Sequence, residues 1–349
     1  MNLDDFKASV VVPIYNNRET IEATIQSITK QKNVILEVIF VDDFSSDDSI
    51  EVLKLCLESP TAVCSQFEFK LITHRDNCGL AAAYNSGIKA CDHDIIVFMH
   101  PDITLESESE FWKLLKPFEK SDVVMSVHHS VPPPDDYWDK INIWSKGFLA
   151  PSLFTRAVGF NGQFDAVRKT ALLSVGGFEV DKFLNAGEDG ALVFQIQKLG
   201  VIFNSEAAAQ HCHHFSNSPN FVNYLEKALQ YGNAQGTLLR NRMFNNFLGV
   251  IIALHREVIV CCLLLSLFAT KWLTILVLGL LLISSARIPG RIFIHRPREI
   301  VFPALLLPVE IIKHFVHFAG ALMGALIGRQ TMRKFSDFLK WNKGAKKSP

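Results

Sequence analysis

The run Ile95–Met99, followed at once by His100, Pro101 and Asp102, constrains the fold of this chain more than any other stretch. Consecutive apolar residues between polar ones are typical of a strand buried on both faces of a parallel sheet. We expect Pro101 to end the strand, because proline cannot continue a central one. Open α/β sheets bind ligands beyond the carboxyl ends of their strands. Asp102 is therefore a candidate ligand of a divalent metal that carries a nucleotide diphosphate, or else an N-cap for a helix over 105–118.

Strand and helix patterns alternate along the first third of the chain. Apolar runs that predict strands lie at 9–15, 37–41 and 69–73, and segments with helical spacing lie at 16–30, 49–57 and 80–90. This alternation predicts an α/β fold with a mostly parallel sheet, flanking helices and right-handed crossovers. Later expected elements are a strand at 123–128, helices at 169–175 and 191–198, and a short strand at 201–203; residues 159–168 carry mixed signals.

Charge and hydropathy separate the first two thirds of the chain from the last third. Lys+Arg and Asp+Glu both number 35, so no global field favours nucleic acid, and we expect no nucleic-acid partner. Residues 258–269 and 273–283 are apolar and are interrupted by Lys271 and Trp272. They form one membrane span with an embedded lysine, or a hairpin with the lysine at the far interface. The arginine-rich loop 287–298 favours the hairpin, because it then lies on the cytoplasmic side.

Two further segments complete the predicted membrane region. Residues 302–327 are apolar, but polar groups recur every three or four positions. That pattern favours a helix lying in the interface, or a re-entrant pair, over a plain crossing. The tail 329–347 is basic with interleaved aromatic residues, which suits an anionic leaflet or a solvated tail.

Carboxylates follow two of the predicted strands. Asp42 and Asp43 come after the second strand and Asp102 after the fourth, so they converge on one edge of a parallel sheet. The chain has neither a phosphate-cradling Gly-x-x-x-x-Gly-Lys-Ser/Thr loop nor a Gly-x-Gly-x-x-Gly sequence. A bound diphosphate would therefore need a cation, and carboxylate and water ligands suit Mg²⁺ or Mn²⁺.

Six stretches resemble, in the same order, the motifs of the family 2 glycosyltransferases, which are inverting enzymes of the GT-A fold that use nucleotide sugars. They are Ser-Val-Val-Val-Pro-Ile-Tyr-Asn (9–16), Val-Asp-Asp-Phe-Ser-Ser-Asp (41–47), Asn-Cys-Gly-Leu-Ala-Ala-Ala-Tyr-Asn-Ser-Gly-Ile (77–88), His-Pro-Asp (100–102), Gly-Gly-Phe (176–178) and Gly-Glu-Asp (187–189). The resemblance covers roughly residues 8–240.

The resemblance implies roles for individual residues. Asp189 would be the catalytic base with Glu188 beside it, Asp102 would bind the metal, and His211 would join the metal or the diphosphate. Asp43 would pair with the nucleotide base. The implied contacts to the nucleotide sugar are Pro13, Tyr15, Asn16, Asp42, Asp43, Asn77, Gly79 and Asn85.

The sequence departs from the family pattern at His100, which stands where the family's Asp-x-Asp has its first acid. His100 is similar to the Asn of a rhamnosyltransferase-type variant, Asn-Pro-Asp. It is then a second metal or sugar contact, or it only fills the strand end. The Gln-x-x-Arg-Trp motif of processive synthases is absent after His214, which favours transfer of a single sugar.

The resemblance implies a membrane-attached enzyme on the cytoplasmic face of the cell membrane. Its donor would be a UDP-, dTDP- or GDP-sugar, and its acceptor a lipid-linked or membrane-proximal glycan. The expected parts are a GT-A domain at 1–245 (nucleotide-binding half 8–104, acceptor half 105–245), a hairpin with interfacial helices at 246–328, and a basic tail at 329–349. The alternative is a non-catalytic nucleotide-sugar-binding scaffold. Nucleotidyl transfer ranks below both, because the chain lacks the Gly-rich basic loop of such enzymes.

Overall fold

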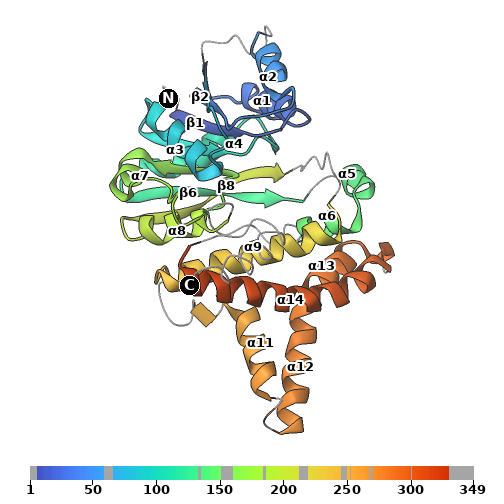
Figure 1. The fold of residues 1–349 in the computed structure, drawn as a ribbon. Coiled ribbons are helices and arrows are strands. Elements are labelled where there is room, and N and C mark those ends of the chain that lie inside the picture. Colours follow the sequence, from blue (N-terminus) through green and yellow to red (C-terminus); the bar gives the residue numbers. More distant parts are fainter. Residues whose placement is uncertain are drawn as a thin grey trace. The chain divides into compact units, whose positions relative to one another are not determined.

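The structure is a computed structural model that describes residues 6–58, 66–132, 135–150, 160–183, 186–211, 219–244, 250–251, 253–266, 268, 270–299 and 301–329. The chain forms two compact units. The sheet unit comprises residues 1–135, 155–180 and 188–216, and the helical unit comprises 136–154, 181–187 and 217–349. Figure 1 labels the elements of both units.

An eight-stranded mixed sheet forms the centre of the sheet unit, in the order β3-β2-β1-β4-β7-β6-β8-β5. The strands are β1 Phe6–Ile14, β2 Val34–Asp42, β3 Phe67–Thr73, β4 Ile95–Met99, β5 Ile103–Leu105, β6 Val123–Val131, β7 Phe164–Arg168 and β8 Val201–His211. The four strands β3, β2, β1 and β4 are parallel to one another, as the sequence predicts. β6 and β8 are also parallel, whereas β7 and β5 run antiparallel to the strands beside them.

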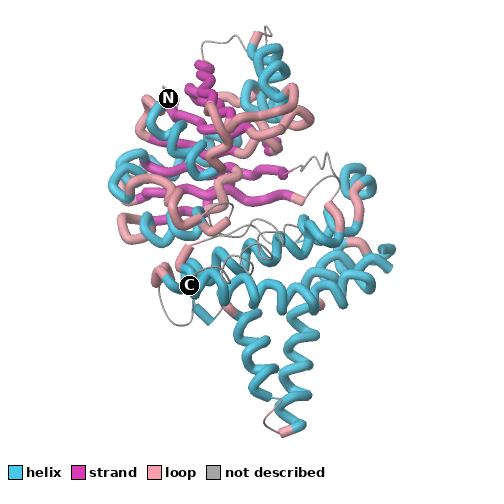
Figure 2. Tube along the Cα trace, viewed as in Figure 1, coloured by secondary structure: helices cyan, strands magenta, loops and turns pink. Residues whose placement is uncertain are grey.

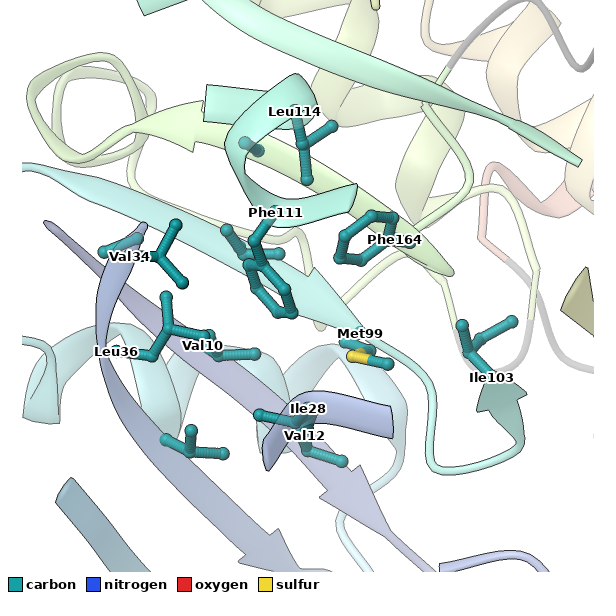
Figure 3. Packing of buried hydrophobic residues seen from close by; sticks show 14 of the residues in the cluster. Val10, Val12, Ile28, Val34, Leu36, Met99, Ile103, Phe111, Leu114 and Phe164 are labelled. Carbon is teal, nitrogen blue, oxygen red and sulfur yellow. The ribbon is translucent and has the colours of Figure 1, made fainter. Parts of the chain in front are cut away.

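Helices cover both faces of this sheet and bury its alternating side chains. They are α1 Ile21–Thr29, α2 Ser49–Leu57, α3 Leu80–Ala90, α4 Glu110–Leu115, η1 Lys116–Glu119, α7 Lys169–Val175 and α8 Glu188–Ile196. Val10 and Val12 of β1 join a cluster with Ile28 of α1 and Phe111 of α4 (Figure 3). Val11 points to the opposite cluster, with α3 and α8. The central strands are thus buried on both faces. Strands of this kind have continuous apolar sequences, so they could be predicted from the sequence.

The second half of the sheet differs from the prediction. The helix expected over 105–118 starts only at Glu110, because Ile103–Leu105 forms β5. The mixed signals at 159–168 conceal β7, and β8 extends to His211, far beyond the predicted 201–203. β8 is rich in alanine and polar residues, which carry little strand propensity, so its pairing with β6 and β5 decides its conformation.

The helical unit consists of α-helices and one 3₁₀ turn in the described residues. They are α5 Asp135–Lys140, α6 Ile143–Leu149, α9 Phe221–Arg240, α11 His255–Ser266, α12 Lys271–Ser285, α13 Arg287–His295, η3 Pro297–Glu299 and α14 Val301–Ile327; Asp135 itself belongs to the sheet unit. The two helices of the predicted hairpin, α11 and α12, lie side by side (Figures 1 and 2), and Thr274 Oγ1 donates a hydrogen bond to the Ser266 carbonyl at 3.0 Å.

α14 is one continuous helix rather than a re-entrant pair, and its polar stripe faces protein. Glu310, Lys313, His314 and His317 are all buried. Glu310 accepts from the Tyr224 hydroxyl at 2.5 Å and pairs with Lys313 at 2.9 Å, while His317 pairs with Glu257. Apolar side chains on the rest of α14 are exposed: Leu305, Ile312, Phe315, Leu322 and Leu326. The arrangement is the reverse of a helix that turns its polar stripe toward water.

Four glycines let α9 and α14 approach to backbone contact. A Cβ atom on Gly232 would lie 2.0 Å from the His317 carbonyl oxygen, and one on Gly236 would lie 1.9 Å from that of Ala321. On α14, a Cβ atom on Gly320 would lie 2.3 Å from the Leu229 carbonyl oxygen, and one on Gly324 would lie 2.0 Å from that of Asn233. Pairs of small residues spaced by four positions are typical of helix interfaces in membranes.

Within the described residues, one helix segment, 304–327 of α14, is long and apolar enough to cross a membrane on its own. The pair α12–α13, bent by 43°, passes the same test when its two helices are taken together. Length and composition therefore allow one span, or two if the bent pair counts as one.

Candidate active site

Asp102, His211 and His100 lie together at the carboxyl end of β4. The antiparallel register of β5 and β8 pairs Ile103 with His211, which brings the histidine beside Asp102. His211 Nε2 lies 2.9 Å from Asp102 Oδ2, and the ring centroids of His100 and His211 are 6.0 Å apart. The side-chain amide of Gln163 contacts His211 Nδ1 at 3.1 Å and leaves Nε2 directed at the carboxylate. The sequence predicted this grouping.

The donor set fits a divalent cation. One ligand atom from each of His100, Asp102 and His211 lies within 4.8 Å of the other two, and all three side chains are partly buried. Two imidazoles and a carboxylate can together hold a divalent metal ion, with water in its remaining positions. The contact from Gln163 holds the His211 ring beside Asp102.

Glu188 and Asp189 form the first turn of α8 in the sheet unit. Glu188 is buried, and Asp189 Oδ1 is also buried, with no hydrogen-bond partner among the described residues. Burial, with repulsion from Glu188 and Asp165, raises the pKa of the Asp189 carboxyl well above its usual range. A carboxylate of raised pKa and unfilled hydrogen-bonding capacity can accept a proton.

Tyr84, on α3, connects the two groups of acids. Its hydroxyl donates to the Gly162 carbonyl at 2.9 Å, and its ring lies parallel to those of Phe178 and His100, with centroids 5.0 and 6.5 Å away. Burial raises the pKa of Tyr84, and the carboxylates of Asp189, Glu188, Asp165 and Asp102 raise it further. Carboxylates of β7, of α8 and of the turn after β4 therefore all contribute to the raised pKa of this phenol. The sequence analysis missed Tyr84, although it is the one aromatic residue within a run of small ones (80–88).

Asp165 is a second residue that the sequence analysis missed. This fully buried carboxylate on β7 accepts hydrogen bonds from the backbone N–H groups of Asn161 and Gly162, at 2.8 and 3.0 Å. Its other oxygen lies 3.0 Å from His128 Nδ1. Asp165 therefore holds the loop that receives the Tyr84 hydroxyl. No sequence motif marked it, because β7 itself was not recognised.

Asp43 anchors the start of α3. Its carboxylate accepts hydrogen bonds from the backbone N–H groups of Cys78 at 2.8 Å and Gly79 at 2.7 Å, and it contacts His74 Nδ1 at 2.8 Å. The second ring nitrogen of His74 contacts Ser86 Oγ, also at 2.8 Å. A carboxylate has about four acceptor positions, so Asp43 can take one further bond. Asp43, His74 and Cys78 are close enough to share a metal, but both nitrogens of His74 already have protein partners.

The other predicted contact residues lie in β1, β2 and α3 or on the loops beside them, and some of them are engaged by the protein. Asn85 exchanges two hydrogen bonds with the backbone of Phe178, at 2.8 and 2.9 Å. Asn77 Nδ2 donates to the Asp43 carbonyl at 3.3 Å, and Asp42 Oδ1 accepts from the Ser45 N–H at 2.9 Å. Pro13 is buried inside β1 and does not end it, whereas Tyr15 and Asn16 are exposed just beyond the strand.

A cavity of about 320 Å³ joins the loops after β1 and β2 to Asp102. Its lining is Asn16, Asn17, Arg18, Glu19, Thr20, Ser46, Asp47 and Asp102. Within this lining Arg18 is the one cation, and it pairs with Asp48 at 3.3 Å. An anionic ligand in this cavity would need additional positive charge, which a cation held by Asp102 would supply.

Comparison with known proteins gives a family match over about half the chain. The family described as Glycosyl transferase family 2 matches residues 9–178. An uncharacterized glycosyltransferase of Rickettsia conorii is 28% identical over 163 residues, which are 45% of this chain and 24% of that protein. The Escherichia coli UDP-Glc:alpha-D-GlcNAc-diphosphoundecaprenol beta-1,3-glucosyltransferase WfgD is 33% identical over 101 residues, 29% of this chain and 36% of that protein. The chain thus spans about a quarter to a third of the length of these curated relatives.

A solved structure extends the likeness of fold to most of the chain. The mannosyltransferase PcManGT from Pyrobaculum calidifontis, in complex with GDP-Man and Mn²⁺, superposes with a TM-score of 0.55 at 16% identity. The match covers 88% of this chain and 86% of that one. At this identity the likeness concerns the fold, and it agrees with the mixed sheet and flanking helices described above.

Proposed function

We propose that this chain, which carries a Glycosyl transferase family 2 domain over residues 9–178, transfers one sugar from a nucleotide diphosphate sugar to an acceptor at a membrane. The donor would occupy the cavity beyond β1, β2 and β4, and a divalent cation would lie at Asp102 and His211 with His100 as a third ligand. Asp189 would act as the general base.

One observation carries this proposal: His100, Asp102 and His211 bring three ligand atoms within 4.8 Å of one another at the end of β4, and the His100 ring stacks on Tyr84 with the centroids 6.5 Å apart. The negative charge of Asp189 also contributes to the raised pKa of the buried Tyr84 phenol, which supports placing the base on the same side of the sheet unit. A metal site and a proton acceptor near one another are what sugar transfer from a diphosphate requires.

The residues support an inverting displacement. Asp189 would take the proton of the acceptor hydroxyl as its oxygen attacks the anomeric carbon from the face opposite the diphosphate. Burial, with the negative charges of Glu188 and Asp165, keeps the pKa of Asp189 high, which makes its carboxylate a stronger base than an exposed aspartate. A bound Mn²⁺ or Mg²⁺ would stabilise the charge of the departing diphosphate. Asp43 would accept one hydrogen bond from the edge of the base, beside Tyr15 and Pro13.

A lipid-linked acceptor and a cytoplasmic-face location are supported by the helical unit and by a relative. WfgD is named for transfer to a diphosphoundecaprenol-linked sugar. The helical unit of this chain buries charged groups such as Glu310 and exposes large apolar ones such as Phe268, which is 93% exposed. Apolar surface of that kind suits the acyl chains of a bilayer. The arginines between residues 287 and 298 suit its cytoplasmic side.

His100 also favours a second candidate, a scaffold that binds nucleotide sugars without turnover. A histidine in place of the first acid of Asp-x-Asp changes the charge beside Asp102. Such a protein would bind UDP or GDP in the presence of Mn²⁺ and transfer no sugar. Its Asp189 would have no role in turnover, so replacing that residue would leave nucleotide binding unchanged.

Sugar transfer from labelled UDP-, dTDP- and GDP-sugars into membrane lipid tests the proposal, with Mn²⁺ and Mg²⁺ compared as cofactors. We expect transfer with one donor, higher activity with Mn²⁺, and a loss of about 10²- to 10⁴-fold in Asp189→Asn. The variant should stay folded, and its melting temperature at pH 8 should equal or exceed that of the native chain. The raised pKa of Asp189 makes its ionised form costly to the fold above that pKa.

The exposed acid Glu51, on α2, offers a matched control. Glu51→Gln should leave transfer unchanged. Metal-dependent nucleotide binding without transfer from any donor would select the scaffold instead.

A further inference from the structure

Phe44 is a large aromatic side chain held half-exposed in an unusual backbone conformation. Its φ is +68°, in the left-handed region that favours glycine, and its side chain is 53% exposed. For a residue with a Cβ this conformation is strained. Strained residues of this kind persist where the surrounding structure holds them, and they concentrate at ligand-binding sites.

The residues on both sides of Phe44 are fixed by hydrogen bonds. Asp43, directly before it, is tied to the start of α3 through Cys78 and Gly79. Directly after it, the Ser45 N–H donates to Asp42 Oδ1 at 2.9 Å. These hydrogen bonds hold the backbone of Phe44 in its strained conformation. The exposed ring is therefore part of the site as it is folded.

A second exposed ring, that of Tyr15, lies at the end of the neighbouring strand. β1 and β2 are parallel with Ile14 opposite Asp42, and the Asp43 N–H donates to the Ile14 carbonyl at 2.8 Å. Adjacent strands lie about 4.8 Å apart, so Tyr15 and Phe44 leave the sheet from neighbouring positions. Tyr15 is 51% exposed.

The two loops that carry these rings are joined to each other and to the cavity. The Asn16 N–H donates to Ser45 Oγ at 3.1 Å, and the Ser46 N–H donates to Asn16 Oδ1 at 2.8 Å. Asn16 and Ser46 also line the cavity that contains Asp102. The residue after Tyr15 and the residue two positions after Phe44 therefore line the space proposed for the nucleotide diphosphate.

We propose that Phe44 stacks on the nucleobase of the donor and forms, with Tyr15, an aromatic platform for it. The inference rests on the proposed function, and it adds a binding residue to that site. Stacking uses the π-face that every base has, so Phe44 would raise affinity for purine and pyrimidine nucleotides alike. Choice between bases would then fall to edge contacts such as the remaining acceptor position of Asp43.

Calorimetric titration of the full-length chain with UDP, GDP and inorganic diphosphate, each with Mn²⁺, tests the inference. From the usual strength of base–aromatic stacking we expect Phe44→Ala to weaken UDP and GDP binding by about five- to a hundredfold. Inorganic diphosphate, which has no base, should bind Phe44→Ala and the native chain equally. Phe44→Trp should retain the nucleotide affinity, and Phe44→Leu, apolar but without a π-face, should lose most of it.

Two further variants separate stacking from folding. Phe44→Gly relieves the backbone strain, so its melting temperature should stay the same or rise while its affinity for UDP falls. Leu55→Ala removes another exposed apolar side chain, on α2, and should leave binding unchanged. Equal nucleotide affinity in Phe44→Ala and the native chain, when the native chain binds UDP, would overturn the inference alone. If the native chain binds no nucleoside diphosphate, the proposed function itself fails.

Discussion

Glu188 and Asp189 illustrate how the surroundings of a carboxyl group determine its proton affinity. Both carboxyls stand in one helical turn, and Asp165 adds a third charge nearby. Water that would screen these charges is largely excluded, since Glu188 is buried and one oxygen of Asp189 is too. The proton affinity of Asp189 is therefore a property of the cluster rather than of the residue alone.

Replacing Glu188 by glutamine should move the acidic limb of the pH–rate profile to lower pH. The substitution removes a negative charge, so the pKa of Asp189 falls and its carboxylate stays ionised in more acidic solution. Measuring kcat/KM for sugar transfer from pH 4.5 to 9 would locate the limb. An unmoved limb would contradict the assigned coupling, and complete loss of activity would make Glu188 rather than Asp189 the base.

Sequence reasoning reached the residues that stand at the ends of strands and missed those that position them. Asp102 and His211 were identified through motif order, and the structure brings them within 2.9 Å of each other. Tyr84 and Asp165 have no motif of their own, because their importance comes from burial among charges contributed by three elements. A sequence pattern shows the spacing and the order of residues. It does not show which side chains from distant segments lie near one another in the fold.

At the scale of elements, the prediction was accurate wherever burial on both faces left a continuous apolar run. α2, α3, α7 and β4 have the predicted bounds, and β1 and β2 differ from them by a few residues. β7 and β8 mix polar, small and apolar residues, so pairing with neighbours rather than local preference makes them strands. The polar stripe of α14 was predicted from the spacing of its polar residues. That spacing does not tell whether the stripe faces water, lipid or protein, so its direction could not be predicted.

The glycine contacts between α9 and α14 give an element-level prediction. Gly236→Ala would place a methyl group 1.9 Å from the Ala321 carbonyl oxygen, so the helices must separate. We expect a loss of about 1–3 kcal/mol in the free energy of unfolding, measured by chemical denaturation in detergent. Gly279→Ala, on α12, is the control, since its Cβ meets nothing within 4 Å. That variant should be neutral or more stable, given the better helix propensity of alanine. An unaffected Gly236→Ala would show that the close approach is not maintained in solution.

For the whole molecule, the distribution of polar and apolar surface differs between the two units. The sheet unit buries its apolar side chains in two clusters on either side of the sheet. The helical unit buries ion pairs and exposes apolar side chains, with Trp272 71% exposed and Phe268 93% exposed. The exposed apolar surface of the helical unit supports the proposed attachment of the chain to a membrane.

The lengths of α11 and α12 predict a hairpin that enters a bilayer without crossing it on either arm. With 12 and 15 residues the helices extend about 18 and 22 Å, short of a hydrocarbon core of about 30 Å. In vesicles containing brominated acyl chains, the fluorescence of Trp272, at the turn, should be quenched. Trp272→Phe should remove the quenched component, and Trp112→Phe, in the sheet unit, should not. Absence of quenching would place the turn outside the lipid.

The pairing of β5 with the end of β8 has a consequence for the order of assembly. His211 reaches Asp102 only because the last strand in the chain pairs with the short strand at the margin of the sheet, opposite Ile103. A nascent chain released before β8 is made would contain the loops proposed for the nucleotide, but only part of the proposed set of cation ligands. The proposed cation site would therefore form only after β8 has been synthesised and has paired with β5. A chain without β8 would bind the sugar donor weakly, and it would therefore hydrolyse little of it.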